Sequence, residues 1–156
     1  MTIDVYRLIA QTQAAYARTI DDDRLEDWPA FFCDPCTYMI TTADNHRDGL
    51  EAGIVFANSM GMLRDRVSAL REANIYERQS YRHILGAPFI VSQEAEAVDS
   101  ETPFLVARIM RTGDTDLFVT GRYLDSYRIA GGVARLTRRI VVCDSSRIDT
   151  LLAIPL

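Results

Sequence analysis

The chain has 156 residues, of which 48% are hydrophobic, and this is the size and composition of one soluble globular domain. Its net charge is −5 and its basic residues, all arginines, form no cluster of the kind that nucleic-acid binding requires. No apolar run approaches the roughly 18 residues of a membrane-spanning helix, and three cysteines do not suit a disulfide framework. We therefore expect a single domain over residues 1–156, located in the cytoplasm, that binds neither nucleic acid nor membrane.

The N-terminal half predicts three helices and a short strand. Apolar and small residues recur every three to four positions from Ile3 to Ile20, which is the spacing of one helix face. The next segment, TIDDDRLEDWPAFF, contains Pro29 and predicts only one or two irregular helical turns. A short strand is expected over Tyr38–Thr42, followed by a surface loop with the sequence ADNHRDG. The apolar stripe of SMGMLRDRVSAL predicts a third helix over Ser59–Leu70.

After Arg78 the pattern changes to alternation and to short apolar runs, which predicts strands. Four long strands are expected, in YRHILGAPFIVSQEA, TPFLVARIMRT, DLFVTGRYLDSYRIA and VARLTRRIVVCD. The connections RTGDTD and IAGGVA favour hairpins, so the last three strands should form an antiparallel meander. Gly86 and Pro88 predict a bend and an edge or bulge. In the third strand one alternating set of residues is expected to face the core: Leu117, Val119, Gly121, Tyr123, Tyr127 and Ile129.

This order of elements is typical of an α+β fold in which helices cover one face of a sheet. We expect a strongly curved mixed or antiparallel sheet wrapped around about three N-terminal helices. Such a cone can enclose a pocket, so its chemical groups need to be considered one by one.

The pair Cys33 and Cys36 has the spacing of a metal or redox motif. A zinc site would also need Cys143 and a histidine from distant segments, and a thioredoxin-like site would need a βαβ unit that the pattern does not predict. A Rieske cluster requires cysteines followed closely by histidines, which is not the case here. We interpret Asp34 and Pro35 as a type I turn, with the cysteines as small apolar residues.

The chain has two histidines, His46 and His83, so a site with two histidines and one carboxylate would need both. Neither a G-x-S-x-G nucleophile elbow nor a phosphate-binding glycine loop is present. Acid–base chemistry remains open, because Tyr16 on the first helix and His83 on a strand could face one another inside the cone. That pair is the basis of one hypothesis, an autonomous isomerase or dehydratase.

Three segments together support a second hypothesis. The segments MLRDRVSAL and YERQSYRHILGAPFIV and the C-terminal DTLLAIPL resemble the small, or beta, subunit of aromatic-ring-hydroxylating dioxygenases. Within that family, AAYARTIDDDRLEDWPAFF and DNHRDGLEAGIVFANS are most similar to the small subunits of terephthalate dioxygenases. The resemblance covers nearly the whole chain and rests on the combination of segments.

The resemblance implies an NTF2-like, cystatin-type curved sheet and a structural subunit without catalytic, cofactor-binding or metal-binding residues of its own. It implies a large alpha subunit that carries a Rieske [2Fe-2S] cluster and a mononuclear Fe(II), and a separate reductase that supplies electrons from NAD(P)H. It also implies a trimer of this chain within an alpha3beta3 hexamer. The subunit contacts that we expect include charged and aromatic residues of the loop and of the first long strand: Arg78, Tyr81, Arg82, Asp44 and His46.

Overall fold

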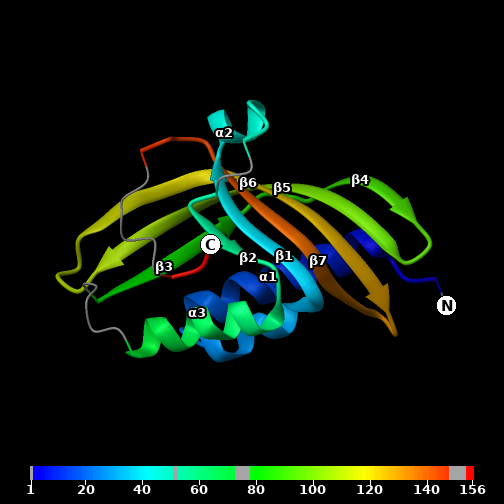
Figure 1. Cartoon of the computed structure of the whole chain (residues 1–156), viewed down its shortest axis with the longest axis horizontal. Coiled ribbons are helices and arrows are strands. Elements are labelled where there is room, and N and C mark those ends of the chain that lie inside the picture. The colour runs from blue at the N-terminus through cyan, green and yellow to red at the C-terminus, as the bar shows by residue number, and fades with distance from the viewer. Residues whose placement is uncertain (1, 51–52, 73–77, 148–153) are drawn as a thin grey trace.

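The computed structural model describes residues 2–50, 53–72, 78–147 and 154–156 of the chain (Figure 1). The helical elements are α1 (Val5–Asp21), the 3₁₀ helix η1 (Leu25–Phe31), α2 (Ala43–Arg47) and α3 (Met60–Glu72). The strands are β1 (Phe32–Thr42), β2 (Val55–Ala57), β3 (Gln79–Leu85), β4 (Phe89–Glu94), β5 (Ala97–Met110), β6 (Thr115–Ala130) and β7 (Val133–Cys143).

The helices begin where the sequence provides caps. The Arg7 N–H donates to the Asp4 carboxylate over 3.1 Å, which caps α1, and the Met62 N–H donates to the Ser59 hydroxyl over 3.2 Å at the start of α3. The expected irregular turns around Pro29 are the 3₁₀ helix η1. All three predicted helices are therefore confirmed, and their apolar sides face the sheet.

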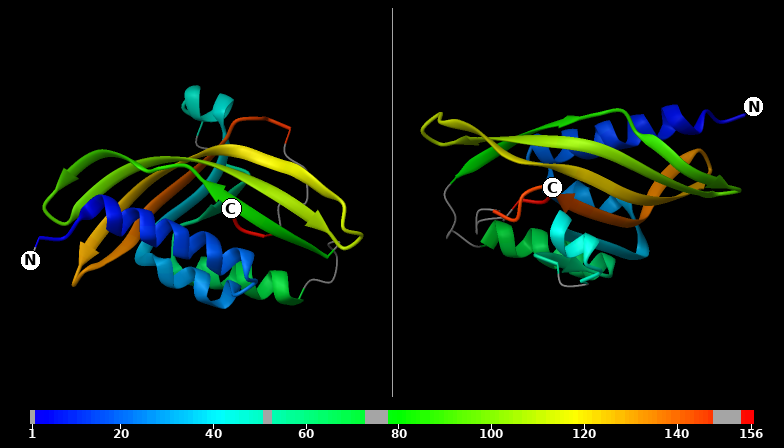
Figure 2. Two further views of the ribbon diagram at one scale, coloured as in Figure 1. Left: turned by 180° about the vertical axis from the view of Figure 1, so that it is seen from behind. Right: turned by 90° about the horizontal axis from the view of Figure 1, so that it is seen from above.

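The described strands form one mixed sheet in the order β2-β1-β7-β6-β5-β3, with β4 also pairing with β5. The predicted meander is confirmed, because β5, β6 and β7 are antiparallel neighbours. Strand β1, which follows the first two helices in the chain, pairs with β7 in parallel on the side opposite β6. Figure 2 shows how the sheet bends over α1, so that α1, η1 and α3 lie on one side of it.

Four local expectations were wrong. Strand β1 begins at Phe32 rather than Tyr38, so Asp34 and Pro35 lie inside a strand and not in a type I turn. The cis Asp34–Pro35 bond lies where the register with β7 is irregular, and this interruption accommodates a residue that cannot donate to the ladder. The expected surface loop forms the short helix α2, because the Thr42 hydroxyl accepts the Asn45 N–H over 3.2 Å and caps it.

The third error concerns the first long strand, which is two strands. The chain bends at Gly86, whose N–H donates to the Pro103 carbonyl over 2.8 Å, and both β3 and β4 pair with β5. The bend predicted from Gly86 and Pro88 is therefore confirmed as the break between two strands.

Leu117 was also expected on the core face of the sheet, but it is exposed. The register of β5 and β6 shifts between Val106 and Ala107, so that Val119 lies opposite Val106 while Leu117 lies opposite Ala107. A shift of one residue moves a side chain to the other face of a sheet, and here it moves Leu117 outward.

Candidate functional site

The inside of the cone contains a buried ion pair between neighbouring strands. Arg139 on β7 donates through Nε to Asp125 Oδ1 over 2.9 Å and through Nη2 to Asp125 Oδ2 over 2.7 Å. The two side chains are 1% and 0% exposed. The Arg139 guanidinium also lies over the rings of Tyr16, at 4.2 Å, and Tyr123, at 3.9 Å. Helix α1 and strands β6 and β7 thus meet at one cation.

Burial and the neighbouring charge shift the pKa of Arg139 in opposite directions. Burial alone would lower the pKa of Arg139, but the adjacent Asp125 carboxylate holds that pKa well above its ordinary value. For the phenols of Tyr16 and Tyr123, burial acts in the other direction and raises the pKa. The guanidinium therefore remains charged, and the two phenols remain neutral.

Further bonds of Asp125 tie the ion pair to the first helix. The Tyr127 hydroxyl donates to Asp125 Oδ2 over 3.1 Å, and the Gln13 amide lies 3.4 Å from the same oxygen. The Gln13 amide also donates to the Thr102 hydroxyl over 2.9 Å. These bonds make the carboxylate a structural anchor, because its oxygens are engaged by the protein itself.

Tyr16 and His83, the acid–base pair of the autonomous-enzyme hypothesis, make separate contacts. The Tyr16 hydroxyl donates to the main-chain oxygen of Leu156 over 2.8 Å. The His83 Nδ1 atom lies 2.7 Å from Asp21 Oδ1, and the main-chain N–H of His83 donates to Asp21 Oδ2 over 2.8 Å. The two groups do not hydrogen bond to each other, and this observation removes the geometric basis of that hypothesis.

The cysteines and histidines do not assemble into a metal site in the described ranges. No group of three or more His, Cys, Asp or Glu side chains there is arranged to hold a metal ion. Cys36 is buried beside Asp34 and Cys33, and burial together with these neighbours raises the pKa of its thiol. These residues do not fit a Rieske cluster or a mononuclear iron.

Among the described helices, none is both long and apolar enough to cross a membrane.

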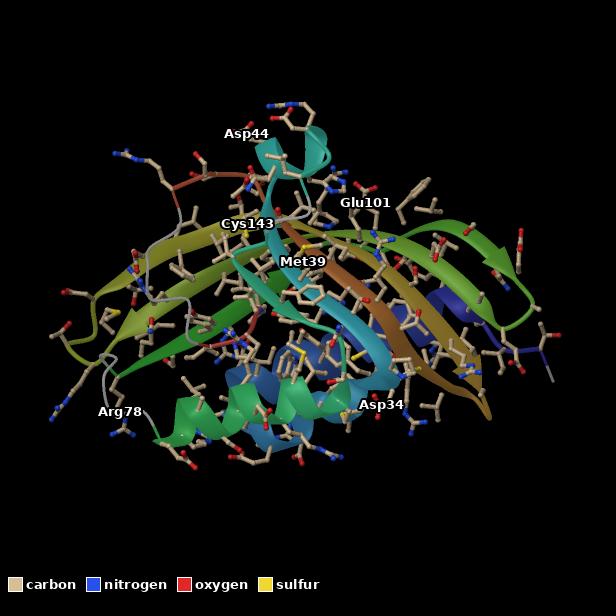
Figure 3. All side chains as sticks on the ribbon, viewed as in Figure 1. Asp34, Met39, Asp44, Arg78, Glu101 and Cys143 are labelled. Atoms are coloured by element: carbon tan, nitrogen blue, oxygen red, sulfur yellow. The ribbon has the colours of Figure 1, made fainter. Side chains whose placement is uncertain are left out.

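The residues predicted as subunit contacts occupy different environments. Arg78, Arg82 and Asp44 are exposed, and Asp44 forms an ion pair with Arg47 over 2.7 Å. Figure 3 shows Asp44 at the top of the view and Arg78 at its lower left, so the two residues belong to separate parts of the surface. His46, also on α2, is half-buried.

Tyr81 differs from the other predicted contacts because it is buried. Its ring lies 5.4 Å from that of Phe118, inside the cone. A contact role for the five residues stays a prediction.

The outer face of the sheet, opposite the helices, exposes apolar side chains. Glu101 and Leu124 alternate with the inward-facing Thr102 and Asp125, so they point outward. The register continues this outward row across six strands, through Phe89, Glu101, Leu124, Ile140, Met39 and Phe56. At its two ends Phe89 is 69% exposed and Phe56 is 50% exposed.

A second group of exposed apolar residues lies on the same face. Ile84 is 54% exposed and lies opposite Leu105 of β5. Leu117 of β6 lies opposite Ala107, the next outward position along β5. We call Ile84, Phe89, Leu105 and Leu117 the outer patch. The exposed Arg82 and the Arg122–Glu101 ion pair, at 2.8 Å, border it. An apolar patch with a charged rim is typical of a protein–protein contact.

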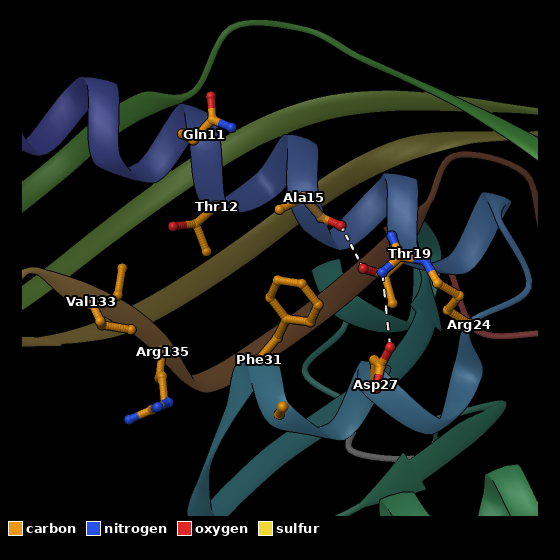
Figure 4. Close-up of a pocket in the computed structure, with 11 residues that line it drawn as sticks. Gln11, Thr12, Ala15, Thr19, Arg24, Asp27, Phe31, Val133 and Arg135 are labelled. Atoms are coloured by element: carbon orange, nitrogen blue, oxygen red, sulfur yellow. Dashed lines mark hydrogen bonds and ion pairs between the residues drawn. The ribbon is translucent and has the colours of Figure 1, made fainter.

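A groove of about 420 Å³ lies outside the cone, between α1, η1 and the start of β7 (Figure 4). Its walls include Ala15, Phe31 and Val133, with Arg24 and Arg135 at the rim. The Arg24–Asp27 ion pair, at 3.8 Å, crosses one end. Neither Tyr16 nor His83 lines this groove, so it does not restore the acid–base hypothesis.

The profile of the family described as "Ring hydroxylating beta subunit" matches residues 15–150 of the chain. The chain belongs to this family. The beta subunit is 57% identical over 148 residues to the Terephthalate 1,2-dioxygenase terminal oxygenase component subunit beta 2 of a Comamonas species, with 95% of this chain and 96% of the relative covered. It is 38% identical to the small subunit of Anthranilate 1,2-dioxygenase of Burkholderia cepacia, with coverages of 95% and 92%.

A solved structure gives the same result for the fold. A beta subunit assigned to an aromatic-ring-hydroxylating dioxygenase of Novosphingobium aromaticivorans matches with a TM-score of 0.90 and 38% identity, over 97% of this chain and 96% of that one. This confirms the expected curved-sheet fold and the family resemblance. The beta subunit is thus a structural component of a dioxygenase, an oxidoreductase, and its partner is an alpha subunit.

Sequence reasoning missed the Arg139–Asp125 pair. Arg139 belongs to the segment VARLTRRIVVCD, which was predicted as a strand, and its side chain is buried inside the chain. The alternation of residues along β6 could have predicted the burial of Asp125. Asp125 is two residues from each of the predicted core residues Tyr123 and Tyr127, so all three point to the same face.

Proposed function

We propose that this beta subunit belongs to a terephthalate 1,2-dioxygenase, which forms a cis-dihydrodiol from an aromatic acid. The observation that carries the proposal is the 57% identity to a Comamonas subunit of that enzyme over 95% of the chain. The relative from Anthranilate 1,2-dioxygenase, at 38%, also belongs to an enzyme named for an aromatic acid.

The proposed partner is a large alpha subunit that binds a Rieske [2Fe-2S] cluster and a mononuclear Fe(II), with electrons delivered from NAD(P)H by a separate reductase. Residues 1–156 act as one domain, in the cytoplasm, and contribute no catalytic residue. Three copies associate within an alpha3beta3 hexamer. In this arrangement the beta subunits hold the alpha subunits in the relative positions that electron transfer between them requires.

The surface proposed to make these contacts is the outer patch together with the predicted charged residues. Ile84 and Phe89 each expose more than half of their surface, and burial of such area stabilises a complex. Arg78 and Arg82 can form two parallel hydrogen bonds with a partner carboxylate, and Asp44 and His46 offer a second polar contact at α2. Tyr81 supports the patch from inside by packing on Phe118.

Co-expression with a tagged alpha subunit tests the proposal. Native mass spectrometry of the captured complex is expected to give equal numbers of the two chains, and terephthalate is expected to yield a cis-dihydrodiol. Ile84→Asp and Phe89→Asp should abolish or strongly weaken assembly while leaving the far-UV circular dichroism unchanged. The matched control is Met62→Asp, an exposed apolar residue on α3, on the inner side of the sheet.

Two results would contradict the proposal. If the tagged alpha subunit never captures this chain, the scaffold role is wrong. If Met62→Asp disrupts the complex as much as Ile84→Asp does, the outer patch is not the contact surface. If the complex turns over anthranilate but not terephthalate, the proposed substrate is wrong and the scaffold role stands.

A further inference from the structure

The last three residues of the chain lie inside the cone. Leu156 is 0% exposed and Ile154 is 8% exposed, and both belong to the hydrophobic core. Figures 1 and 2 show this end of the chain between the sheet and the helices. Segment 154–156 forms neither helix nor strand, so the backbone ladders of the sheet do not account for its position.

Side-chain hydroxyls bind the main chain of Leu156. The Leu156 oxygen accepts from the Tyr16 hydroxyl over 2.8 Å and from the Tyr38 hydroxyl over 3.1 Å. The Leu156 N–H donates to the Tyr38 oxygen over 3.1 Å. Tyr38 therefore contacts both polar atoms of one residue, which is how a binding site recognises the backbone of a peptide ligand.

The two tyrosines also pack against residues outside segment 154–156. Tyr38 packs edge-to-face against Trp28 at 5.2 Å and Phe32 at 5.8 Å. Tyr16 packs against Phe31 at 5.5 Å and lies beneath the Arg139 guanidinium. Burial holds the pKa of both phenols above the ordinary value, so both hydroxyls keep the proton that they donate. A rigid site loses little entropy when it binds its ligand.

We propose that the interior of the cone contains a peptide-binding site whose resident ligand is segment 154–156. Tyr16 and Tyr38 recognise the backbone of the final residue, and the surrounding aromatic side chains select an apolar side chain. The ligand class is a short apolar peptide that presents a main-chain N–H and oxygen at an apolar residue. The site is separate from the outer patch and does not depend on the proposed dioxygenase partner.

A truncated beta subunit that ends at residue 153 tests the proposal, with a synthetic peptide of residues 148–156 as the probe. Trp28 is the single tryptophan of the chain and touches Tyr38, so its fluorescence reports on occupancy. The truncated chain should lose about 5 °C or more in Tm, and the peptide should restore at least half of that loss saturably. The matched control is the same peptide with Leu156→Asp, which should restore nothing. Tyr38→Phe in the truncated chain should weaken binding of the unmodified peptide about 3- to 10-fold.

A truncated chain with unchanged Tm and unchanged Trp28 emission would overturn the proposal, as would equal binding of both peptides or binding of neither. If the truncated chain does not fold, carboxypeptidase digestion of the complete chain replaces the peptide assay. Tyr38→Phe should then speed removal of the last three residues at least threefold. Equal trimming rates in both chains would also overturn the proposal.

Discussion

Replacement of Arg139 by methionine should destabilise the subunit severely, because it leaves Asp125 buried without its counter-ion. The Asp125 side chain is 0% exposed and would retain two described bonds, from Tyr127 at 3.1 Å and Gln13 at 3.4 Å. Removal of one partner from a buried ion pair costs about 3–5 kcal/mol of unfolding free energy. Methionine is the replacement of choice because its flexible apolar chain fills the space between the rings of Tyr16 and Tyr123.

A second substitution separates the buried charge from the lost packing. Asp125→Asn in the Arg139→Met background removes the uncompensated charge and keeps an acceptor for Tyr127. The double variant should therefore be more stable than Arg139→Met alone, by about 1–3 kcal/mol. Urea unfolding followed by Trp28 fluorescence measures both changes, at one protomer concentration because assembly adds to apparent stability.

The reasoning would be refuted by a loss of less than about 1 kcal/mol in Arg139→Met, since a buried unpaired carboxylate costs more than that. It would also be refuted if the losses from Arg139→Met and Asp125→Asn simply added in the double variant. Additivity would mean that the two groups stabilise the fold independently, although their atoms lie 2.7 Å apart.

Three further predictions concern the Arg71 ion pairs and the cysteines. Arg71 on α3 bonds Asp23 at 2.9 Å and Glu26 at 2.7 Å, so Arg71→Gln should cost about 0.5–1 kcal/mol in urea unfolding, less at high salt. The hydrogen bond from Arg71 lowers the pKa of the Glu26 carboxyl below its ordinary 4.5. The stabilisation from this pair is present above pH 4.5 and is lost as the pH falls through the lowered pKa, so a cost of Arg71→Gln that does not shrink with falling pH would contradict the prediction. Burial raises the pKa of the Cys143 thiol to about 12, so a thiol reagent at pH 8 should label Cys33 well before Cys143. Cys36→Ser should leave assembly and turnover intact, and loss of a bound metal in that variant would show that the cysteine pair is not structural.

The elements that sequence reasoning predicted well are those with local causes. The β5–β7 meander follows from alternation and from turns such as Gly131–Gly132, which both have positive φ. The parallel pairing of β1 with β7 could not be predicted in this way, because it joins segments about a hundred residues apart and leaves no periodic trace in either.

The buried ion pair shows how one extra residue defeats a register prediction. The hairpin begins with Ala130 opposite Val133, and a regular register from there would place Asp125 opposite Arg138. The register shifts next to Tyr127, and Asp125 lies opposite Arg139 instead. Arg138 thereby points outward and Arg139 inward, so the bulge decides which of two adjacent arginines becomes part of the core.

The same groups explain why a cone with tyrosine, histidine and aspartate in its interior can serve as a structural subunit. Catalysis by acid–base groups needs polar atoms that are free to meet a substrate. Here Asp125 is bound by Arg139, the Asp21 carboxylate by His83, and the hydroxyls of Tyr16 and Tyr38 by Leu156. These bonds join strand β6 to β7, helix α1 to strand β3, and the chain end to both α1 and β1, so the interior polar groups rigidify the cone. A rigid curved sheet presents its outer patch in a fixed geometry, and this is what a scaffold must supply to its partners.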